Sequence, residues 1–378
     1  MSLSWEPLLT AHAPSPRSSH QISAHRSVLY LFGGEDGPPS SHFGYGTPVS
    51  SLTVYCLDLD ATEPVWQVVP IKSGAPPSAR LGHGQCIVED PSGATAFLYV
   101  FGGRQPAEQQ GGEPGRAPTY DGSEIIASLN DMHRLDLSAG VWEQVHSTGD
   151  VPSPRSYLQM VGPVNGSLLV FGGMFDTGDA RYSDLYTFDI GANEWRRLPD
   201  GPMKGRGGAG VCATGGSDPR LWVVGGFCGR PTSDVWEYSI SAGLWRARED
   251  LALPEARSIF ACGLLGGDGD EKGGARELEI LVFGGELTAA SGHAEPGKFT
   301  NDTLRIRVSG AGAGDAVSAI NIAVPPAARG WTSGCVAGTS AGERFVVFGG
   351  IGEGGDQQGL HGERLGDLHV LREDQKES

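Results

Sequence analysis

The sequence predicts an all-β fold made of one unit repeated six times. Glycine accounts for 59 of the 378 residues, about twice its usual share of roughly 7 %. Charged residues make up only 19 % of the chain, which argues against long charged helices. An aliphatic run ending in an aromatic residue or valine and two glycines recurs at Phe32-Gly33-Gly34, Phe101-Gly102-Gly103, Phe171-Gly172-Gly173, Val224-Gly225-Gly226, Phe283-Gly284-Gly285 and Phe348-Gly349-Gly350.

Each unit carries the signals of four antiparallel strands. The second strand ends at the two glycines, which let backbones pass where a Cβ would clash. The third strand alternates apolar and polar residues, as in Ser183–Asp189, and this alternation is typical of a half-buried strand. The fourth strand carries Trp66, Trp142, Trp195 or Trp245. An arginine opens each unit, at Arg17, Arg80, Arg155, Arg206, Arg257 and Arg329.

Six such units predict a six-bladed β-propeller, a ring that leaves few free sheet edges. We expect a single domain over residues 1–374 and a tail at 375–378. The blades are predicted at about 15–70, 76–148, 151–200, 203–250, 253–325 and 327–374, the last with residues 3–9. The sixth unit ends without a tryptophan strand, and Ser4 to Leu8, with Trp5, supplies one. The N-terminal strand is therefore predicted to close the ring. In the fifth unit, Ala316 to Val324 takes the fourth-strand position without a tryptophan.

Composition limits the classes of partner. A formal charge of −17 repels phosphate backbones and anionic lipid surfaces, so we expect neither a nucleic-acid nor a membrane partner. No apolar run approaches the roughly 20 residues that span a bilayer, and the N-terminus has no secretory pattern. Six cysteines without a CxxC pair indicate reduced thiols that pack as small apolar side chains. We expect a cytoplasmic protein that is a monomer or weak dimer.

The repeated residues resemble the kelch repeat, and the resemblance covers nearly the whole chain. Among kelch proteins, several short strings resemble the plant specifier proteins, which include the nitrile-specifier, epithiospecifier and thiohydroximate-forming proteins. These strings are Pro16 to His20, Arg206 to Gly210, Ala256 to Ala261 and Arg329 to Thr332, and they keep their order along the chain. The resemblance implies an enzyme that directs the breakdown of a sulfated thiohydroximate (a glucosinolate aglycone), or a related small sulfur-containing metabolite, to nitrile-type products.

The same resemblance implies a ferrous iron site. Specifier proteins hold Fe(II) with a Glu-x3-Asp-x3-His segment after the fifth glycine pair, a carboxylate and imidazole set that leaves positions open for substrate. Glu286 and His293 match the first and last of these ligands. Their interval is one residue shorter than in the family, and Leu287 to Gly292 contains no aspartate. The alternative is that Glu286 and His293 are solvated residues of an insertion loop.

Candidate substrate contacts follow from the same match. Arg104 and Arg155 align with the arginines that bind the substrate sulfate, a role suited to the planar guanidinium, and Trp331 is predicted to form an aromatic wall. Further candidates for the channel mouth are Arg17, His20, Arg80, Tyr157, Arg206, Arg257 and Arg329. A structural alternative stays open, because the opening arginines recur in every unit and could pair with the aspartates of the third strands.

A non-catalytic function is also compatible with the repeats. Kelch propellers serve as binding modules as well as enzymes, so the fold does not decide between them. In this alternative, the arginine-rimmed face binds an acidic peptide or protein partner. The predicted ligand is thus a small anionic or sulfur-containing molecule, or an acidic protein.

Overall fold

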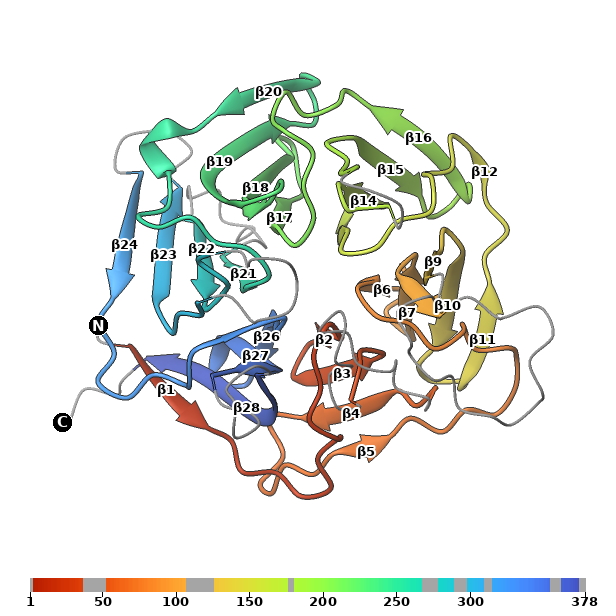
Figure 1. The fold of residues 1–378 in the computed structure, drawn as a ribbon. Coiled ribbons are helices and arrows are strands. Elements are labelled where there is room, and N and C mark those ends of the chain that lie inside the picture. Colours follow the sequence, from red (N-terminus) through yellow and green to blue (C-terminus); the bar gives the residue numbers. More distant parts are fainter. Residues whose placement is uncertain are drawn as a thin grey trace.

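Six antiparallel sheets surround a central channel in the computed structural model of the chain (Figure 1). The structure describes residues 3–36, 52–106, 126–175, 180–266, 278–288, 298–308, 315–353 and 362–373. Within these ranges the only helix is a short 3-10 turn, η1 (Glu249–Leu251). The described residues include no helix that is long and apolar enough to cross a membrane.

The first three blades each run from the channel outward in chain order. Blade 1 consists of β2 (Gln21–His25), β3 (Val28–Phe32), β4 (Tyr55–Asp58) and β5 (Gln67–Val68). Blade 2 consists of β6 (Gly84–Glu89), β7 (Ala96–Phe101), β10 (Met132–Asp136) and β11 (Val141–Gln144), with a separate hairpin of β8 (Arg104–Pro106) and β9 (Ile126–Ser128). Blade 3 consists of β13 (Gln159–Val164), β14 (Ser167–Phe171), β15 (Leu185–Asp189) and β16 (Glu194–Leu198), with β12 (Thr148–Gly149) parallel to β16.

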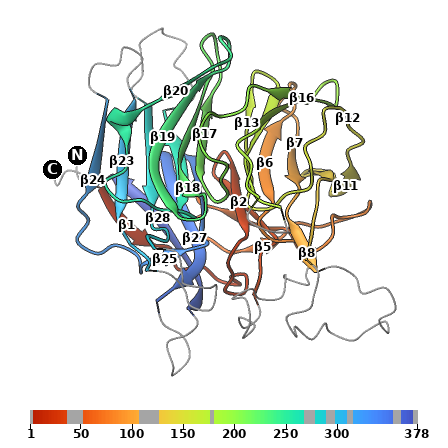
Figure 2. The same ribbon diagram turned by 45° about the horizontal axis from the view of Figure 1, so that its top comes forward.

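The remaining blades repeat this order. Blade 4 consists of β17 (Gly210–Thr214), β18 (Arg220–Phe227), β19 (Pro231–Ser239) and β20 (Leu244–Ala247). Blade 5 consists of β21 (Ala261–Leu265), β22 (Leu278–Phe283), β23 (Thr303–Val308) and β24 (Ala316–Ile320). Blade 6 consists of β26 (Ser333–Thr339), β27 (Gly342–Gly352), β28 (Glu363–Glu373) and β1 (Leu3–Pro7), and β25 (Arg329–Gly330) pairs with the end of β27. Figure 2 shows β8 and β25 at the same face of the ring.

The N-terminal strand closes the ring, which confirms the predicted architecture. β1 pairs antiparallel with β28, with Trp5 opposite Leu371. The indole of Trp5 is buried, and its Nε1 donates a 2.9 Å hydrogen bond to Oγ1 of Thr303 in blade 5. Trp5 therefore joins the two ends of the chain and also ties blade 6 to blade 5.

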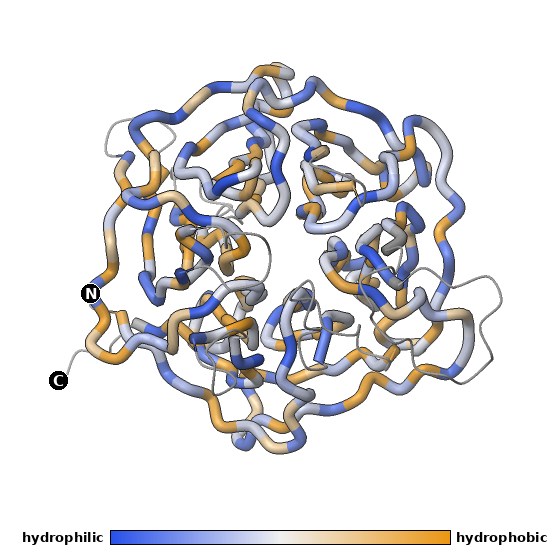
Figure 3. Tube along the Cα trace, viewed as in Figure 1, coloured by the Kyte–Doolittle hydropathy of each residue, from blue (hydrophilic) through white to orange (hydrophobic). Residues whose placement is uncertain are grey.

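Aromatic pairs join neighbouring blades. The tryptophan of each outer strand packs on the phenylalanine that precedes the glycine pair of the blade before it. The centroid distances are 5.8 Å for Trp142 and Phe32, 5.0 Å for Trp195 and Phe101, 5.9 Å for Trp245 and Phe171, 5.0 Å for Trp5 and Phe283, and 5.6 Å for Trp66 and Phe348. Apolar and polar stretches alternate along the outer strands (Figure 3), because one face of each blade packs on its neighbour.

The junction between blades 4 and 5 lacks this aromatic pair. Blade 4 has Val224 where the others have phenylalanine, and β24 of blade 5 has no tryptophan. Leu251 of η1 is fully buried in the same apolar cluster as Val224. The apolar contact at this junction is instead made by aliphatic side chains together with Trp222 and Phe260.

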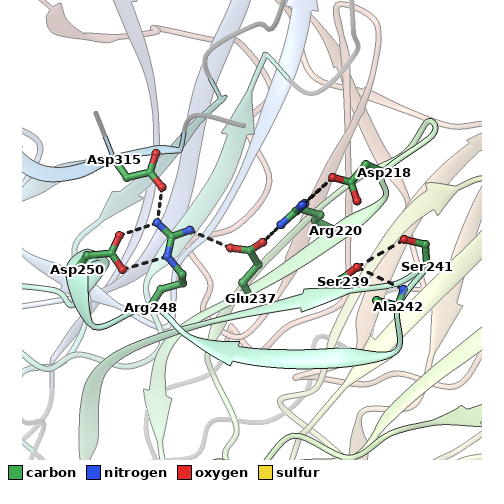
Figure 4. A network of polar contacts seen from close by, with 9 residues as sticks. All are labelled: Asp218, Arg220, Glu237, Ser239, Ser241, Ala242, Arg248, Asp250 and Asp315. Carbon is green, nitrogen blue, oxygen red and sulfur yellow. Dashed lines mark hydrogen bonds and ion pairs between the residues drawn. The ribbon is translucent and has the colours of Figure 1, made fainter. Parts of the chain in front are cut away.

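A buried polar network adds to the same junction (Figure 4). Arg248 donates to Glu237 at 2.8 Å, to Asp250 at 2.6 Å and to Asp315, which leads into β24. Glu237 also accepts from Arg220. The side chains of Arg248, Glu237 and Asp315 are 3–6 % exposed, so each buried charge has an opposite charge beside it, as burial requires.

Candidate functional site

Six equivalent residues form a belt around the channel. Each lies two positions after an opening arginine, and each adopts the left-handed backbone conformation: Ser19, Gly82, Tyr157, Gly208, Ile259 and Trp331, with φ between 49° and 60°. Five backbone N–H···O=C bonds of 2.6–3.0 Å link all six residues, from Ile259 through Gly208, Tyr157, Gly82 and Ser19 to Trp331. Such conformations are uncommon for residues other than glycine. The belt therefore fixes where the side chains of Ser19, Tyr157, Ile259 and Trp331 lie.

All six belt residues line a cavity of about 590 Å³, counted with its open mouth. Tyr157, Ile259 and Trp331 are half-buried and form much of its wall. The Trp331 ring meets Phe299 edge-on, with the centroids 5.8 Å apart. The cavity thus combines aromatic and aliphatic side chains with hydroxyl groups.

A chain of polar side chains crosses the channel mouth. Arg104 Nη2 donates to the Tyr157 hydroxyl at 3.2 Å, and its guanidinium lies 4.9 Å from the centroid of the Tyr157 ring. The Tyr157 and Ser19 hydroxyls are 3.2 Å apart, and Ser19 Oγ donates to the carboxylate of Glu35 at 3.3 Å. Because a serine hydroxyl has one proton, Tyr157 is the donor to Ser19. We call Arg104, Tyr157, Ser19 and Glu35 the polar relay.

Glu35 is the buried end of the polar relay, at 1 % exposure. Its carboxylate also accepts from Ser18 Oγ at 2.9 Å, and Arg364 Nη2 lies 3.6 Å away. The buried charge is thereby matched by hydroxyl donors and one guanidinium.

Gly82 makes the relay sterically possible. It occupies the belt position between Ser19 and Tyr157, and a Cβ added there would lie 3.1 Å from the Tyr157 backbone nitrogen and 3.3 Å from a ring carbon. The Tyr157 side chain passes over this glycine to reach Ser19. A glycine in blade 2 therefore connects side chains of blades 1 and 3.

Charged residues also follow the glycine pairs at this mouth. The first residue after a glycine pair forms an antiparallel β-bridge with the residue that follows the opening arginine. Examples are Glu35 with Ser18, Arg104 with Leu81 and Glu286 with Ser258. Glu35, Arg104 and Glu286 are 1 %, 5 % and 6 % exposed. Arg104 and Glu286 are residues that the sequence predicts for the site, whereas Glu35 and Ser19 are not. Glu35 directly follows a glycine pair, as Arg104 and Glu286 do, and this equivalent position could have indicated it from the sequence.

The six opening arginines form the framework of the blades. Arg155 is typical: Nε donates to the Ser153 carbonyl, Nη1 to the Gly172 carbonyl, and both Nη atoms to Asp184 at 2.7 and 3.0 Å. Arg80, Arg206, Arg257 and Arg329 repeat the contact with a third-strand aspartate, whereas Arg17 lies 5.5 Å from the Tyr55 ring centroid.

All six guanidinium groups are fully buried, at 0–2 % exposure. The predicted arginine-rimmed face is therefore not formed by Arg17, Arg80, Arg155, Arg206, Arg257 and Arg329, and the structural alternative describes them. Arg155 lies at the same end of the blades as Arg104, since its carbonyl accepts from Gly103 N, but its side chain stacks on Tyr182, 4.3 Å from the ring centroid.

His20 belongs to the inner packing of the ring and also borders the cavity. Its ring meets Phe348 edge-on at 5.4 Å. Burial, reinforced by the nearby charge of Arg17, lowers the pKa of His20 to about 3. His20 is therefore neutral at physiological pH.

The predicted iron ligands are only partly within the described residues. Glu286 is buried between Ser258 and Phe299, while His293 lies outside the described ranges. The described part of the chain contains no group of three His, Cys, Asp or Glu side chains that could hold a metal ion. Glu286 by itself does not make a complete ligand set.

Several known proteins are similar to this chain over more than half of its length. Bovine kelch domain-containing protein 2 is 30 % identical over 281 residues, which cover 72 % of this chain and 61 % of that protein. The N-(sulfonatooxy)prop-2-enimidothioate sulfolyase of Thlaspi arvense is 26 % identical over 312 residues, covering 76 % of each chain. A rice Adagio-like protein 1 is 29 % identical over 224 residues, which span 57 % of this chain and 29 % of that protein.

The architecture also recurs in a solved structure, that of YjhT, with a TM-score of 0.63 over 95 % of both chains and 15 % identity. At that identity the likeness concerns the fold. The model of the KLHDC2/KLHL20/DRC7 Kelch-repeats domain matches residues 42–268, more than half of the sequence. The chain therefore belongs to the kelch-repeat family.

Proposed function

We propose that this kelch propeller binds a small anionic molecule at its channel mouth and acts as a lyase on an N-(sulfonatooxy) imidothioate. The polar relay carries this proposal, because two hydroxyls that line the cavity, those of Tyr157 and Ser19, are connected to the buried guanidinium of Arg104 and the buried carboxylate of Glu35. The similarity to the Thlaspi arvense sulfolyase over 76 % of both chains supports the choice of substrate class.

Each part of the relay has a chemical role in this reaction. Loss of sulfate from the N–O bond leaves negative charge on the departing oxygen, and Arg104 can donate two hydrogen bonds to such an oxyanion. In the relay, the Tyr157 hydroxyl donates a hydrogen bond to Ser19, and the Ser19 hydroxyl donates one to the Glu35 carboxylate. The hydroxyls can therefore orient the substrate and pass the proton of its thiol toward the carboxylate, while sulfate leaves with the electron pair of the N–O bond and the sulfur leaves as elemental sulfur, which gives the nitrile. Ile259 and Trp331 supply apolar surface for the hydrocarbon substituent of such a substrate.

Iron is a separate part of the proposal. Glu286 and His293 remain the residues predicted to hold Fe(II), which would supply a Lewis acid with open positions for the substrate sulfur. The roles given above to Arg104, Tyr157, Ser19 and Glu35 use the side chains of this chain alone.

The proposal is tested by turnover of an imidothioate released in situ from its glucosinolate. The wild type should release sulfate and nitrile-type products faster than the spontaneous reaction. Arg104→Met should reduce this rate about 10- to 150-fold, since a hydrogen bond to a charged group contributes roughly 1.5–3 kcal/mol. Arg196→Met is the matched control, because Arg196 is an outer-strand residue whose side chain is 66 % exposed. Wild-type rates equal to the spontaneous rate, with and without Fe(II), would overturn the lyase proposal.

A second candidate is a protein-interaction module that binds an acidic peptide at the same mouth. Membership of the kelch-repeat family supports it, because kelch propellers also serve as binding modules without catalysis. The two candidates differ in one measurement. A peptide that binds the wild type, and binds Arg104→Met at least tenfold more weakly, in a protein without imidothioate turnover would favour the module.

A further inference from the structure

Two cysteines meet across the boundary between blades 4 and 5. Cys212 lies on β17 and Cys262 on β21, the innermost strands of their blades, and their Sγ atoms are 3.5 Å apart. Both are free thiols. Cys212 is 6 % exposed, whereas Cys262 is half-buried and lines the central cavity. One sulfur of the pair is thus open to molecules in the channel.

The two strands pack closely beside the cysteine pair. A Cβ added at Gly210 on β17 would lie 2.9 Å from Cys262 Sγ and 3.1 Å from Cys262 Cβ. A disulfide needs the two sulfurs at about 2.05 Å and Cβ atoms roughly 3.5–4.5 Å apart. The two sulfurs are 3.5 Å apart, in van der Waals contact, so they must approach to about 2.05 Å for the bond to form.

We infer that Cys212 and Cys262 form a modification site, at which a peroxide entering the channel produces a disulfide between blades 4 and 5. In the first step the Cys262 sulfur attacks one peroxide oxygen, the O–O bond breaks, and Cys262 becomes a sulfenic acid as one water leaves. In the second step Cys212 attacks the Cys262 sulfur, the S–O bond breaks, and a second water leaves with the Cys212 proton. Two thiols are oxidised and hydrogen peroxide is reduced to two waters.

The surroundings set the order of these steps. The contact with Cys262, together with burial, raises the pKa of Cys212. Cys212 therefore keeps its proton, and Cys262, which faces the cavity, meets the oxidant first. Cys86 has a different environment: its Sγ lies 2.8 Å from the Gly162 carbonyl oxygen, and burial raises its pKa to about 12.

The link would fall at the junction that lacks an aromatic pair. There Val224 replaces phenylalanine and β24 has no tryptophan. The two cysteines are 50 positions apart in sequence, and closing a loop of that length restricts the unfolded chain. The oxidised protein should therefore melt a few degrees higher than the reduced protein.

The test uses the full chain, reduced, freed of reductant and treated with hydrogen peroxide near neutral pH. Intact mass should fall by two hydrogen atoms, and non-reducing peptide mapping should recover a Cys212–Cys262 cross-link. Cys212→Ser and Cys262→Ser should each lose the cross-link and the rise in Tm. Cys56→Ser and Cys228→Ser are matched controls that should keep both.

Two results would overturn the inference. One is alkylation of both Cys212 and Cys262 as free thiols after peroxide treatment of the folded protein. The other is sulfinic acid on Cys262 with no cross-linked peptide. If either serine variant fails to fold, the wild-type peptide map still decides the question. Neither result depends on lyase activity, so this inference stands or falls apart from the proposed function.

Discussion

Ser19 and Tyr157 are 138 residues apart in sequence, yet their hydroxyls lie 3.2 Å apart across the channel mouth. They come from the openings of blades 1 and 3, and the equivalent residue of blade 2 is Gly82. The Tyr157 ring reaches Ser19 because Gly82 has no side chain in its path. The geometry of the candidate site thus depends on a glycine as much as on its polar groups.

Gly82→Ala should displace the Tyr157 ring and weaken anion binding. The new Cβ would meet the Tyr157 backbone at 3.1 Å and ring carbons at 3.3 and 3.4 Å, and the left-handed backbone costs about 1–2 kcal/mol for a non-glycine residue. Gly166→Ala is the matched control, with φ of 82° and nothing within 4 Å. Both variants should lose stability in urea, but only Gly82→Ala should lose sulfate binding by calorimetry. Equal sulfate affinity in the two variants would contradict the steric role of Gly82.

Asp184→Ala should strongly destabilise the propeller. It removes the partner of Arg155, whose side chain is 0 % exposed, and an unpaired buried charge costs about 3–5 kcal/mol. Asp200→Ala removes a partner of Arg197 in an exposed pair, with side chains 47 % and 52 % exposed, and should cost at most about 1 kcal/mol. Urea unfolding followed by tryptophan fluorescence measures both. Similar losses would show that the opening arginines are not framework residues.

Trp5→Ala should cost about 3–5 kcal/mol, as for other buried aromatic residues. The ring contacts Phe283 and Phe345 at centroid distances of 5.0 and 5.9 Å. Trp5→Phe keeps an aromatic ring but loses the hydrogen bond to Thr303, and should cost only about 1 kcal/mol. Leu9→Ala, at a residue 90 % exposed, serves as the control and should leave the Tm unchanged. A truncation of residues 1–9 that melts like the intact chain would refute closure by β1.

Stability should fall as the pH decreases from about 6.5 toward 3, because of His20 and His83. Burial lowers the pKa of each to about 3, whereas an unfolded histidine titrates near 6.5. In this window the unfolded chain binds the extra protons, so the free energy of unfolding rises with pH by roughly 1.4 kcal/mol per unit for each histidine.

His83→Gln should reduce that slope, and urea titrations at several pH values measure it. Below about pH 4, protonation of the aspartates that pair with the opening arginines should lower the free energy of unfolding further. Burial alone would raise the pKa of Asp131, but hydrogen bonds from His133 and Arg80 lower it well below its usual value. Its stabilisation is present above the unfolded pKa near 3.9 and disappears as the pH falls. An unchanged slope in His83→Gln would contradict a neutral buried His83.

Local sequence determined the repeat and the blades. Three repeated features serve contacts within one blade or between adjacent blades. They are the glycine pairs, the opening arginines and the tryptophan strands. The carbonyl of the first glycine accepts from the arginine in every blade, for example Gly102 from Arg80 and Gly349 from Arg329. Because this contact repeats, the pattern could be recognised without coordinates, and so could the closure by Trp5.

Tertiary structure alone decided which of the candidate arginines contacts a residue that lines the channel. The sequence shows Arg104 and Arg155 as similar candidates, yet Arg155 is enclosed by its own blade and Arg104 stacks on Tyr157 at the channel. Likewise, nothing local links Ser19 to Tyr157 or Cys212 to Cys262. These contacts form only when the ring closes, since side chains on different blades meet through the curvature of the whole propeller rather than through spacing along the chain.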